Sequence, residues 1–356
     1  MGVLKKLKLK YKIILVVAVI ILGLIIIYFS SIGPVKIGSK ENVEVEIKPG
    51  TSRNEIGNIL KDKKLIRSSL VFKVYTVIVP TDNLKAGTYL FNQGMSMREI
   101  VNELEKGSKY NPNLVILTFK EGKRITDYAK LISTETNHSY DEVLGVFKDK
   151  EYAKELVNEY WFLTDKILDS NIYYPLEGYL FPDTYHFDDK DVEIKEIIVK
   201  VLDETDNKLS DYRTELEKDI HYYMTMASVV ELEGTNTTNR KMIVGIFKNR
   251  MSSGMNMGSD VTTYYGLQKA MTSDLASDEF LKDNPYNTRS VNMIGKMPVG
   301  PICSSSLSSV EASLNPTDSD YLFFVADKNG NIYYTRTNQE HDQKVAEIKE
   351  KGDWIW

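Results

Sequence analysis

A long apolar segment near the N-terminus constrains this chain more than any other feature. Residues 13–29 are almost wholly apolar and uncharged, and they have about the length that a helix needs to cross the hydrocarbon core of a bilayer. Lysines crowd the N-terminal flank of this segment. The positive flank predicts that residues 1–12 are cytoplasmic, that residues 13–31 span the membrane, and that the rest of the chain lies outside.

The alternative for this segment is a cleaved signal peptide. Its apolar run exceeds a usual signal core, and residues 29–33 make a poor small-x-small cleavage site. We therefore expect a single-pass anchor in the cell membrane.

Composition limits the chemistry of the remaining chain. The formal net charge of −5 in 356 residues gives no reason to expect a nucleic-acid partner. The single Cys303 cannot form an internal disulfide, and no histidine or cysteine neighbours it at metal-ligand spacing. The histidines are scattered, at His138, His186, His221 and His341. We expect no metal and no cofactor, so any reaction must rely on carboxylates, hydroxyls and backbone groups.

A short unit of strand, glycine turn and helix recurs after the anchor. Its copies begin with the predicted strands 43–47, 89–91 and 115–119. In the first two copies, Ser52 with Glu55 and Ser96 with Glu99 have the spacing of a capping box. One such unit cannot bury its apolar face alone, so we expect the three copies to pack together as a small α+β domain.

Residues 109–220 are predicted to be a mainly helical, charged connecting region. The exception is residues 175–185, where aromatic side chains alternate with carboxylates between two prolines. Such a loop suits a sugar-binding groove, in which rings stack on pyranose faces, and it suits an interdomain seam equally well. The sequence does not choose between these interpretations.

A strongly apolar helix is predicted to end at Gly234. Tyr223, Met226, Ala227 and Val230 form a buried stripe at helical spacing, and Glu231 follows at its rim. A carboxyl group beside apolar walls has a raised pKa, which suits a general acid. The alternative is a solvated glutamate in the last turn of an ordinary core helix. Glu233 is the other candidate, about 200° around the helix from Glu231.

Polar and glycine-rich stretches follow this helix. Near the C-terminus, the apolar run 320–327 precedes Asn329-Gly330 and a second apolar run at 332–335, which predicts a β-hairpin. In chain order, the distinctive stretches are 84–89, 176–185, 227–231, 247–250, 259–262, 265–267, 285–288, 298–302 and 321–335. Their order and spacing resemble the YceG-like family of endolytic murein transglycosylases over nearly the whole extracytoplasmic chain.

The resemblance implies an α+β fold with an N-terminal transmembrane helix. It implies a LysM-like βααβ module at 40–108, the connecting region at 109–220, and a mixed α/β catalytic domain with a C-terminal β-hairpin at 221–356. LysM modules of other proteins bind N-acetylglucosamine-containing glycans, and the sequence leaves open whether this one does. The chain departs from the family at Val261, where proline is usual, and at Ser304-Ser305-Ser306, which replace Asn-Pro-Gly. These departures concern the rim of the expected groove.

The resemblance also implies cleavage of the MurNAc-GlcNAc bond within peptidoglycan strands, leaving 1,6-anhydroMurNAc ends. The sugar's own C6 hydroxyl is then the nucleophile, so one acid suffices, and Glu231 is its predicted position. The residues predicted to hold the substrate are Ser259, Asp260, Thr262, Tyr286, Asn287 and Thr288. Local turn chemistry explains each of them equally well. His341 could also lie near the site.

Two alternative functions remain open at this stage. One is a muramidase-type hydrolase with Asp260 as second carboxylate, because ordinary glycoside hydrolysis uses two. The other is a non-catalytic glycan-binding scaffold of the cell-wall synthesis machinery. The expected partners are peptidoglycan glycan strands, the cytoplasmic membrane and cell-wall synthases of the penicillin-binding class, with termination of nascent strands as the expected role.

Overall fold

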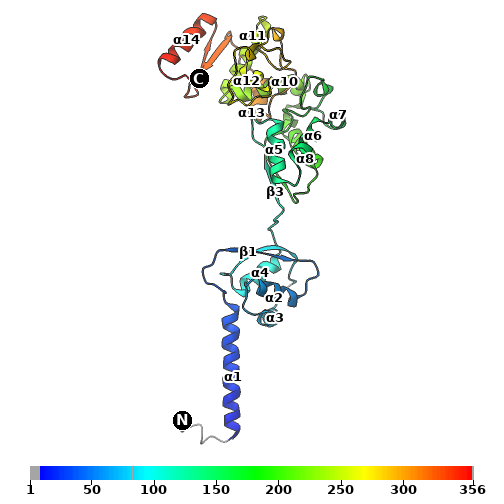
Figure 1. Cartoon of the computed structure of the whole chain (residues 1–356), viewed down its shortest axis with the longest axis vertical. Coiled ribbons are helices and arrows are strands. Elements are labelled where there is room, and N and C mark those ends of the chain that lie inside the picture. Colours follow the sequence, from blue (N-terminus) through cyan, green and yellow to red (C-terminus); the bar gives the residue numbers. More distant parts are fainter. Residues whose placement is uncertain (1–8, 82, 355–356) are drawn as a thin grey trace. The chain divides into compact units, whose positions relative to one another are not determined.

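The structure, a computed structural model, describes residues 9–81 and 83–354 and divides the chain into two compact units at Asn113 (Figure 1). Both units combine helices with two-stranded antiparallel sheets, so the predicted α+β class is confirmed. The predicted cytoplasmic segment 1–12 lies largely outside the described residues.

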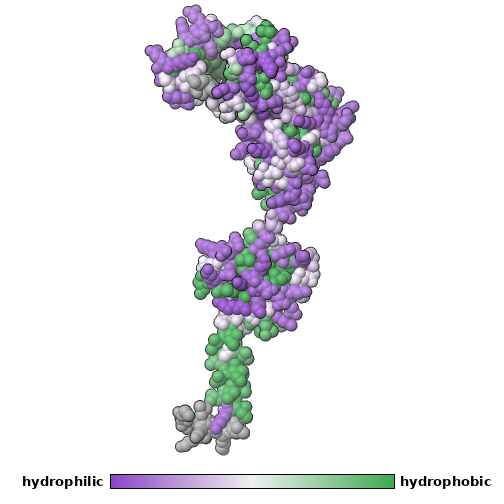
Figure 2. Space-filling view, viewed as in Figure 1, coloured by the Kyte–Doolittle hydropathy of each residue, from purple (hydrophilic) through white to green (hydrophobic). Residues whose placement is uncertain are grey.

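Helix α1 (Leu9–Ile32) contains the predicted anchor. Within it, Tyr11–Ile32 is a 22-residue stretch with a mean hydropathy of 3.2, long and apolar enough to cross a membrane. At 1.5 Å per residue this stretch is about 33 Å long, which matches a hydrocarbon core of roughly 30 Å. Figure 2 shows it as a mostly apolar rod.

Unit 1 continues with a strand, two helices, a strand and a helix. These are β1 (Asn42–Ile47), α2 (Arg53–Asp62), α3 (Ser69–Ile78), β2 (Gly87–Asn92) and α4 (Met97–Lys106). Strands β1 and β2 pair antiparallel, with Val45 opposite Tyr89. The predicted capping boxes are confirmed: Ser52 with Glu55 begins α2, and Ser96 with Glu99 begins α4.

The third copy of the repeat belongs to a different compact unit from the first two, so the predicted common domain is wrong. Its strand β3 (Val115–Thr118) belongs to unit 2, where it pairs antiparallel with β4 (Thr184–Phe187). Helix α5 (Ile125–Glu135) follows β3 as expected. The strand-turn-helix pattern predicts β3 and α5 correctly, but it carries no information about which strand pairs with β3.

The first half of unit 2 is mainly helical, as predicted. After α5 come α6 (Tyr140–Lys148), α7 (Lys150–Glu159), α8 (Ile194–Leu209) and α9 (Arg213–Leu216), with 3₁₀ turns at Asp165–Leu168 and Ser210–Tyr212. The aromatic loop 175–185 lies inside the packing: Leu176, Tyr179 and Leu180 are all buried. The burial favours the seam interpretation of this loop over a sugar-binding groove.

The second half of unit 2 contains the segments that precede and follow Gly234. Its helices are α10 (Ile220–Glu233), α11 (Thr237–Ser252), α12 (Asp260–Gly266), α13 (Leu307–Leu314) and α14 (Asn338–Glu350), with 3₁₀ turns at Glu279–Leu281 and Val291–Met293. Strands β5 (Phe323–Ala326) and β6 (Ile332–Thr335) pair antiparallel across a turn at Gly330.

Helix α10 contributes to two hydrophobic cores. Ile220, Met224 and Ala227 pack into the core built from α5 to α8. Met226, Val229 and Val230 pack into a second core with α11 and α12. Of the predicted stripe, Met226, Ala227 and Val230 are buried and Tyr223 is half-buried, and the helix is buried on its other sides too. It is apolar all round because it lies between two cores.

Candidate active site

The two carboxylates at the end of α10 face different surroundings. Glu231 contacts α11 and the start of α13, whereas Glu233 contacts the residue that precedes α12. Their separation of two positions turns them roughly 200° apart on a helix, so one side chain cannot substitute for the other.

Glu231 is surrounded by hydrogen-bond donors. Arg240 Nη2 donates to Glu231 Oε1 at 2.7 Å. Ser306 donates to Oε2 from its backbone N at 2.8 Å and from its Oγ at 2.6 Å, and Ser309 Oγ donates to the same oxygen at 2.8 Å. The Glu231 side chain is only 5% exposed. We refer to Glu231, Arg240, Ser306 and Ser309 as the Glu231 cluster.

This cluster has the features of a structural ion pair. Ser306 is the N-cap of α13, where a negative charge is stabilised by the helix dipole and by free backbone N–H groups. The carboxylate thereby joins α10, α11 and α13. A proton donor must also be able to lose and regain its proton beside the substrate, and a carboxylate already holding four donors is poorly arranged for that step.

Glu233 has the opposite surroundings. Ser259 Oγ donates to Glu233 Oε1 at 2.5 Å, and within the described chain Glu233 has no ion-pair partner. Burial raises the pKa of Glu233 to about 7; the Ser259 hydrogen bond lowers this pKa, the negative charge of Asp260 raises it, and Arg289 lowers it. A carboxyl group with such a pKa carries its proton in a large fraction of molecules near neutral pH, as a general acid requires.

Asp260 and Arg289 form an ion pair next to Glu233. Asp260 lies in the first turn of α12 and accepts a hydrogen bond from Arg289 Nε. Both side chains are close to half exposed, so the pair is accessible from solvent. Of the residues predicted to hold the substrate, Asp260 is the one with an accessible charged group, and Ser259 is the one that contacts a candidate acid.

The other predicted substrate residues are fully buried, and their contacts are with neighbouring groups of the protein. Thr262 Oγ1 and Thr288 Oγ1 lie 2.8 Å apart. Asn287 accepts a hydrogen bond from Thr263 Oγ1 at 2.6 Å and donates to backbone carbonyls of residues 280 and 282. Tyr286 packs among aromatic rings. These side chains fix the loop that carries Arg289, and local turn chemistry, the alternative interpretation, describes them better than sugar contact does.

The profile of the YceG-like family matches residues 45–347. The chain belongs to the YceG-like family. A curated relative named endolytic murein transglycosylase, from Bacillus subtilis, is 34% identical over 91% of this chain and 90% of its own length. A Streptococcus pneumoniae protein of the same name is 33% identical over 89% of this chain and 60% of its own length. A crystal structure of a YceG-like protein from Listeria monocytogenes is 36% identical in sequence to this chain. The match covers 86% of this chain and the full length of the Listeria chain, with a TM-score of 0.62.

The two departures from the usual YceG-like pattern have clear places in the structure. Val261 lies in the first turn of α12, where a backbone N–H needs no helical partner, so valine and proline are both compatible with the helix. The serines at 304–306 are buried. Ser304 exchanges backbone hydrogen bonds with Gly122 and Lys123, and Ser306 belongs to the Glu231 cluster. Hydrogen bonds of Ser304 and Ser306 therefore hold this segment, whereas the hydroxyl of Ser305, at the position of the usual proline, has no hydrogen-bond partner among the described residues.

Several residues of this YceG-like site escaped the sequence-based prediction. Arg240, Arg289 and Ser309 give no local signal, because each meets its partner only through the tertiary fold. Glu121, in the glycine turn before α5, is another residue that the sequence-based prediction missed. Burial and then the negative charge of Glu231 raise the pKa of Glu121, whereas Arg240 lowers it. The Glu-Gly turn of the third repeat copy is the available signal in the sequence, and this pattern alone indicates only a turn.

His341 has a structural setting in α14. Its ring lies against that of Phe323, with ring centroids 5.5 Å apart, and burial lowers its pKa. No contact in the described chain connects it with Glu231 or Glu233. Across residues 9–81 and 83–354, no three His, Cys, Asp or Glu side chains are grouped so that they could hold a metal ion.

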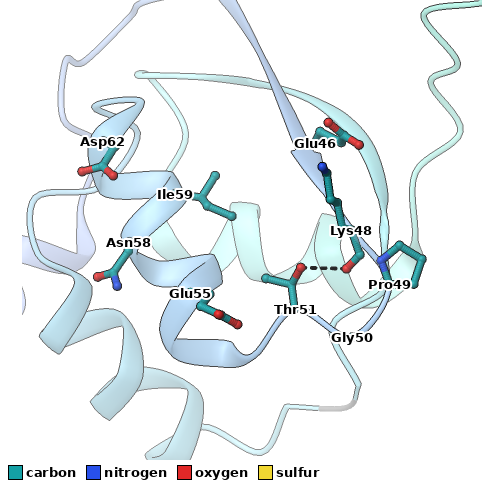
Figure 3. Close-up of a pocket in the computed structure, with 9 residues that line it drawn as sticks. All are labelled: Glu46, Lys48, Pro49, Gly50, Thr51, Glu55, Asn58, Ile59 and Asp62. Atoms are coloured by element: carbon teal, nitrogen blue, oxygen red, sulfur yellow. Dashed lines mark hydrogen bonds between the residues drawn. The ribbon is translucent and has the colours of Figure 1, made fainter.

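Unit 1 has a shallow depression of its own. The turn between β1 and α2 forms one side, and α2 forms the other (Figure 3). The lining residues are Glu46, Lys48, Pro49, Gly50, Thr51, Glu55, Asn58, Ile59 and Asp62. Thr51 Oγ1 donates to the backbone carbonyl of Lys48, which fixes the turn, and the side chains of Asn58 and Asp62 extend from α2 (Figure 3).

Proposed function

We propose that this chain is a membrane-anchored endolytic lytic transglycosylase of peptidoglycan. It would cleave the MurNAc-GlcNAc bond within glycan strands and leave 1,6-anhydroMurNAc ends, thereby terminating nascent strands. Membership of the YceG-like family and the names of the relatives support the substrate and the reaction class. The observation that carries the proposal is Glu233, a carboxyl group with a pKa near 7, one hydroxyl partner and an accessible ion pair beside it.

In the proposed reaction, Glu233 acts first as acid and then as base. Its protonated carboxyl donates a proton to the glycosidic oxygen while the bond from that oxygen to C1 of MurNAc breaks. The resulting carboxylate then accepts the proton of the C6 hydroxyl as O6 bonds to C1. The proton returns to Glu233, so no water enters the product and the enzyme is regenerated.

This proposal moves the acid from Glu231, the sequence-based prediction, to Glu233. Glu231 is ion-paired, bonded by four donors and almost fully covered. Glu233 has one donor, and burial raises its pKa into the range useful for acid catalysis. Ser259 would orient the carboxyl group, and Asp260 with Arg289 would contact the hydroxyl or N-acetyl groups of the sugar.

We propose further that α1 holds the protein in the cytoplasmic membrane with both units outside. The apolar length of α1 and the lysines before it support this topology. Cell-wall synthases of the penicillin-binding class would then be close enough to act as partners. Protease added to intact, wall-stripped cells should digest the C-terminal portion, and full protection of that portion would contradict the topology.

For unit 1 we propose a LysM-like module. The order β1–α2–α3–β2 and the antiparallel pairing of its strands support the comparison. The depression beside Lys48 and Asn58 is then the place to test for glycan binding. Titrating chitooligosaccharides into the full chain and into its Asn58→Ala variant measures the affinity of each protein for the sugar. Equal responses from the two proteins would exclude the depression as the sugar site.

The reaction itself is tested by digesting purified glycan strands with the full chain in heavy-oxygen water. Mass spectrometry should find unlabelled anhydro ends, each lighter than a hydrolysed end by one water. Labelled reducing ends as main product would establish a muramidase-type hydrolase and make Asp260 the second carboxylate. Absence of any cleavage, with glycan still bound, would establish the scaffold alternative.

A further inference from the structure

Helix α3 has two apolar faces, although a surface helix normally has one. Phe72 and Tyr75 are buried in the core of unit 1. On the opposite face, Leu70, Val74, Val77 and Ile78 are 69%, 38%, 72% and 65% exposed. Their spacing of four, seven and eight positions makes them one continuous ridge, which we call the α3 stripe. A contiguous exposed apolar patch of this kind marks a binding surface.

The α3 stripe lies where α1 enters unit 1. Helices α1 and α3 contact each other, and Tyr28 and Ile32 of α1 pack against the core of the unit. Arg67, immediately before α3, donates from Nη1 to the carbonyls of Ser30 and Gly33, both at 3.0 Å. No flexible linker therefore separates the end of the apolar span from α3.

The surface closest to such a junction is that of the bilayer. Because the last turn of α1 is bonded to the unit, α3 cannot move far from the level at which α1 leaves the membrane. Figure 1 shows α3 at the end of unit 1 nearest α1 and β1 at the opposite end, and Figure 2 shows apolar surface at the base of the unit. The stripe thus belongs to the helix of unit 1 that contacts the apolar span.

Charge near the stripe fits the same ligand. Lys73 is the only charged residue of α3, and its side chain is exposed together with the stripe. Lys61, Lys63 and Lys64 are exposed where α2 ends, shortly before α3. Basic side chains that flank an apolar helix face favour the headgroup layer of an anionic membrane, in which lysine extends its amine toward the phosphates.

We propose that α3 is an interfacial helix whose stripe inserts into the headgroup and acyl boundary of the membrane that α1 spans. The inference rests on the proposed anchoring by α1. A second attachment point beside the span would stop unit 1 from tilting and would fix its height above the membrane. A protein partner or a second copy covering the stripe is the competing explanation, and the following experiment separates them.

The test uses the full chain at one copy per nanodisc of mixed zwitterionic and anionic lipids. Nitroxide labels are placed on Ile20→Cys in α1, Val77→Cys in the stripe and Leu90→Cys in β2. Leu90 is the matched control, because it is apolar and 39% exposed but lies in the sheet. Cys303 is fully buried, and unmodified protein measures its background labelling.

The ratio of oxygen to nickel-chelate accessibility reports the depth of each label in lipid. We expect a value at Val77 several-fold above that at Leu90 and closer to that at Ile20. A lipid-like value at Ile20 with equal, aqueous values at Val77 and Leu90 would overturn the inference and leave the anchor intact. An aqueous value at Ile20 would instead contradict the anchoring. A Val77 label that loses exposure only when two copies share a disc would establish a dimer.

A polar variant provides the second test. A label on Val74→Cys is compared in the background Leu70→Ser/Val77→Ser/Ile78→Ser and in a control background, Leu90→Ser/Leu114→Ser/Ile116→Ser. All six serine substitutions are at exposed positions. The stripe variant should lose the lipid-like value, and the control variant should keep it. Equal values in the two backgrounds would contradict a role for the stripe in lipid binding.

Discussion

Replacing each of the two glutamates in α10 by glutamine should separate a structural effect from a catalytic one. The substitutions are two residues apart in one helix and change the same atoms, so each is the matched control of the other. We expect Glu231→Gln to lower the stability of unit 2 with turnover retained in the folded protein. We expect Glu233→Gln to abolish turnover in a protein that remains folded.

The magnitude for Glu231→Gln follows from its burial. The Glu231 and Arg240 side chains are 5% and 12% exposed, so the substitution leaves a covered guanidinium without its counter-charge. Breaking a buried ion pair on one side costs about 3–5 kcal/mol, and glutamine can still accept some of the hydrogen bonds, which favours the lower end. For a domain of this size, about 3 kcal/mol corresponds to a fall in Tm of roughly 6–12 °C.

The magnitude for Glu233→Gln concerns rate. Removing a positioned acid typically lowers the rate by about 10² to 10⁴. Its effect on stability depends on pH. The folded-state pKa of Glu233, about 7, lies above the ordinary value of 4.5, so wild-type stability falls as pH rises between these values. Glutamine has no charge to bury, so the variant should match the wild type at pH 4 and exceed it at pH 8.

The assay combines thermal melting at both pH values with single-turnover release of anhydro ends, measured well below either Tm. Folded fractions from the melts normalise the rates. The reassignment of the acid would be refuted if Glu231→Gln lost turnover while fully folded and Glu233→Gln turned over at the wild-type rate. Loss of turnover in both folded variants would show that the Glu231 cluster is needed to position the acid.

Three further substitutions in unit 2 have expected outcomes that can be measured. Asp260→Asn should shift the alkaline fall in turnover to lower pH, because the negative charge of Asp260 raises the Glu233 pKa; a pH-rate profile measures this. Burial raises the folded-state pKa of Glu177 to about 8, above the ordinary value of 4.5, so wild-type stability falls as pH rises between these values. Glu177→Gln should therefore match the stability of the wild type within about 1 kcal/mol at pH 4 and exceed it at pH 9, as thermal melting at both pH values measures. Gly178→Ala should lower the Tm strongly, because a Cβ there would lie 2.2 Å from a proline Cβ and the residue has φ of +80°.

The sequence was sufficient wherever the determinants are local. Ser52 with Glu55 and Ser96 with Glu99 specify helix starts within four residues, and both were predicted. The apolar segment of α1 likewise needs no partner to be recognised. These elements follow from hydrogen bonding and hydropathy along a few turns of chain.

Choosing between the two glutamates required the tertiary structure. The sequence places Glu231 at an apolar rim and gives no sign of its partners, because Arg240 lies nine residues away and the serine donors come 75 and 78 residues later. The proposal for Glu233 likewise depends on Ser259, 26 residues on, which gives no sign in the sequence of bonding to it. The residues Thr262 and Thr288 illustrate the same difficulty: a polar motif in sequence became a buried hydrogen bond in the fold.

The position of α10 between two cores links the chemistry to the completion of folding. Glu233 acquires its raised pKa from burial, and that burial exists only after the packing on both sides of the helix has formed. A partly folded chain with only one core closed would hold Glu233 as an ordinary ionised surface carboxylate. Under the proposed function, the acid would therefore appear only in the completed fold, and a partly folded chain would not yet cleave glycan strands.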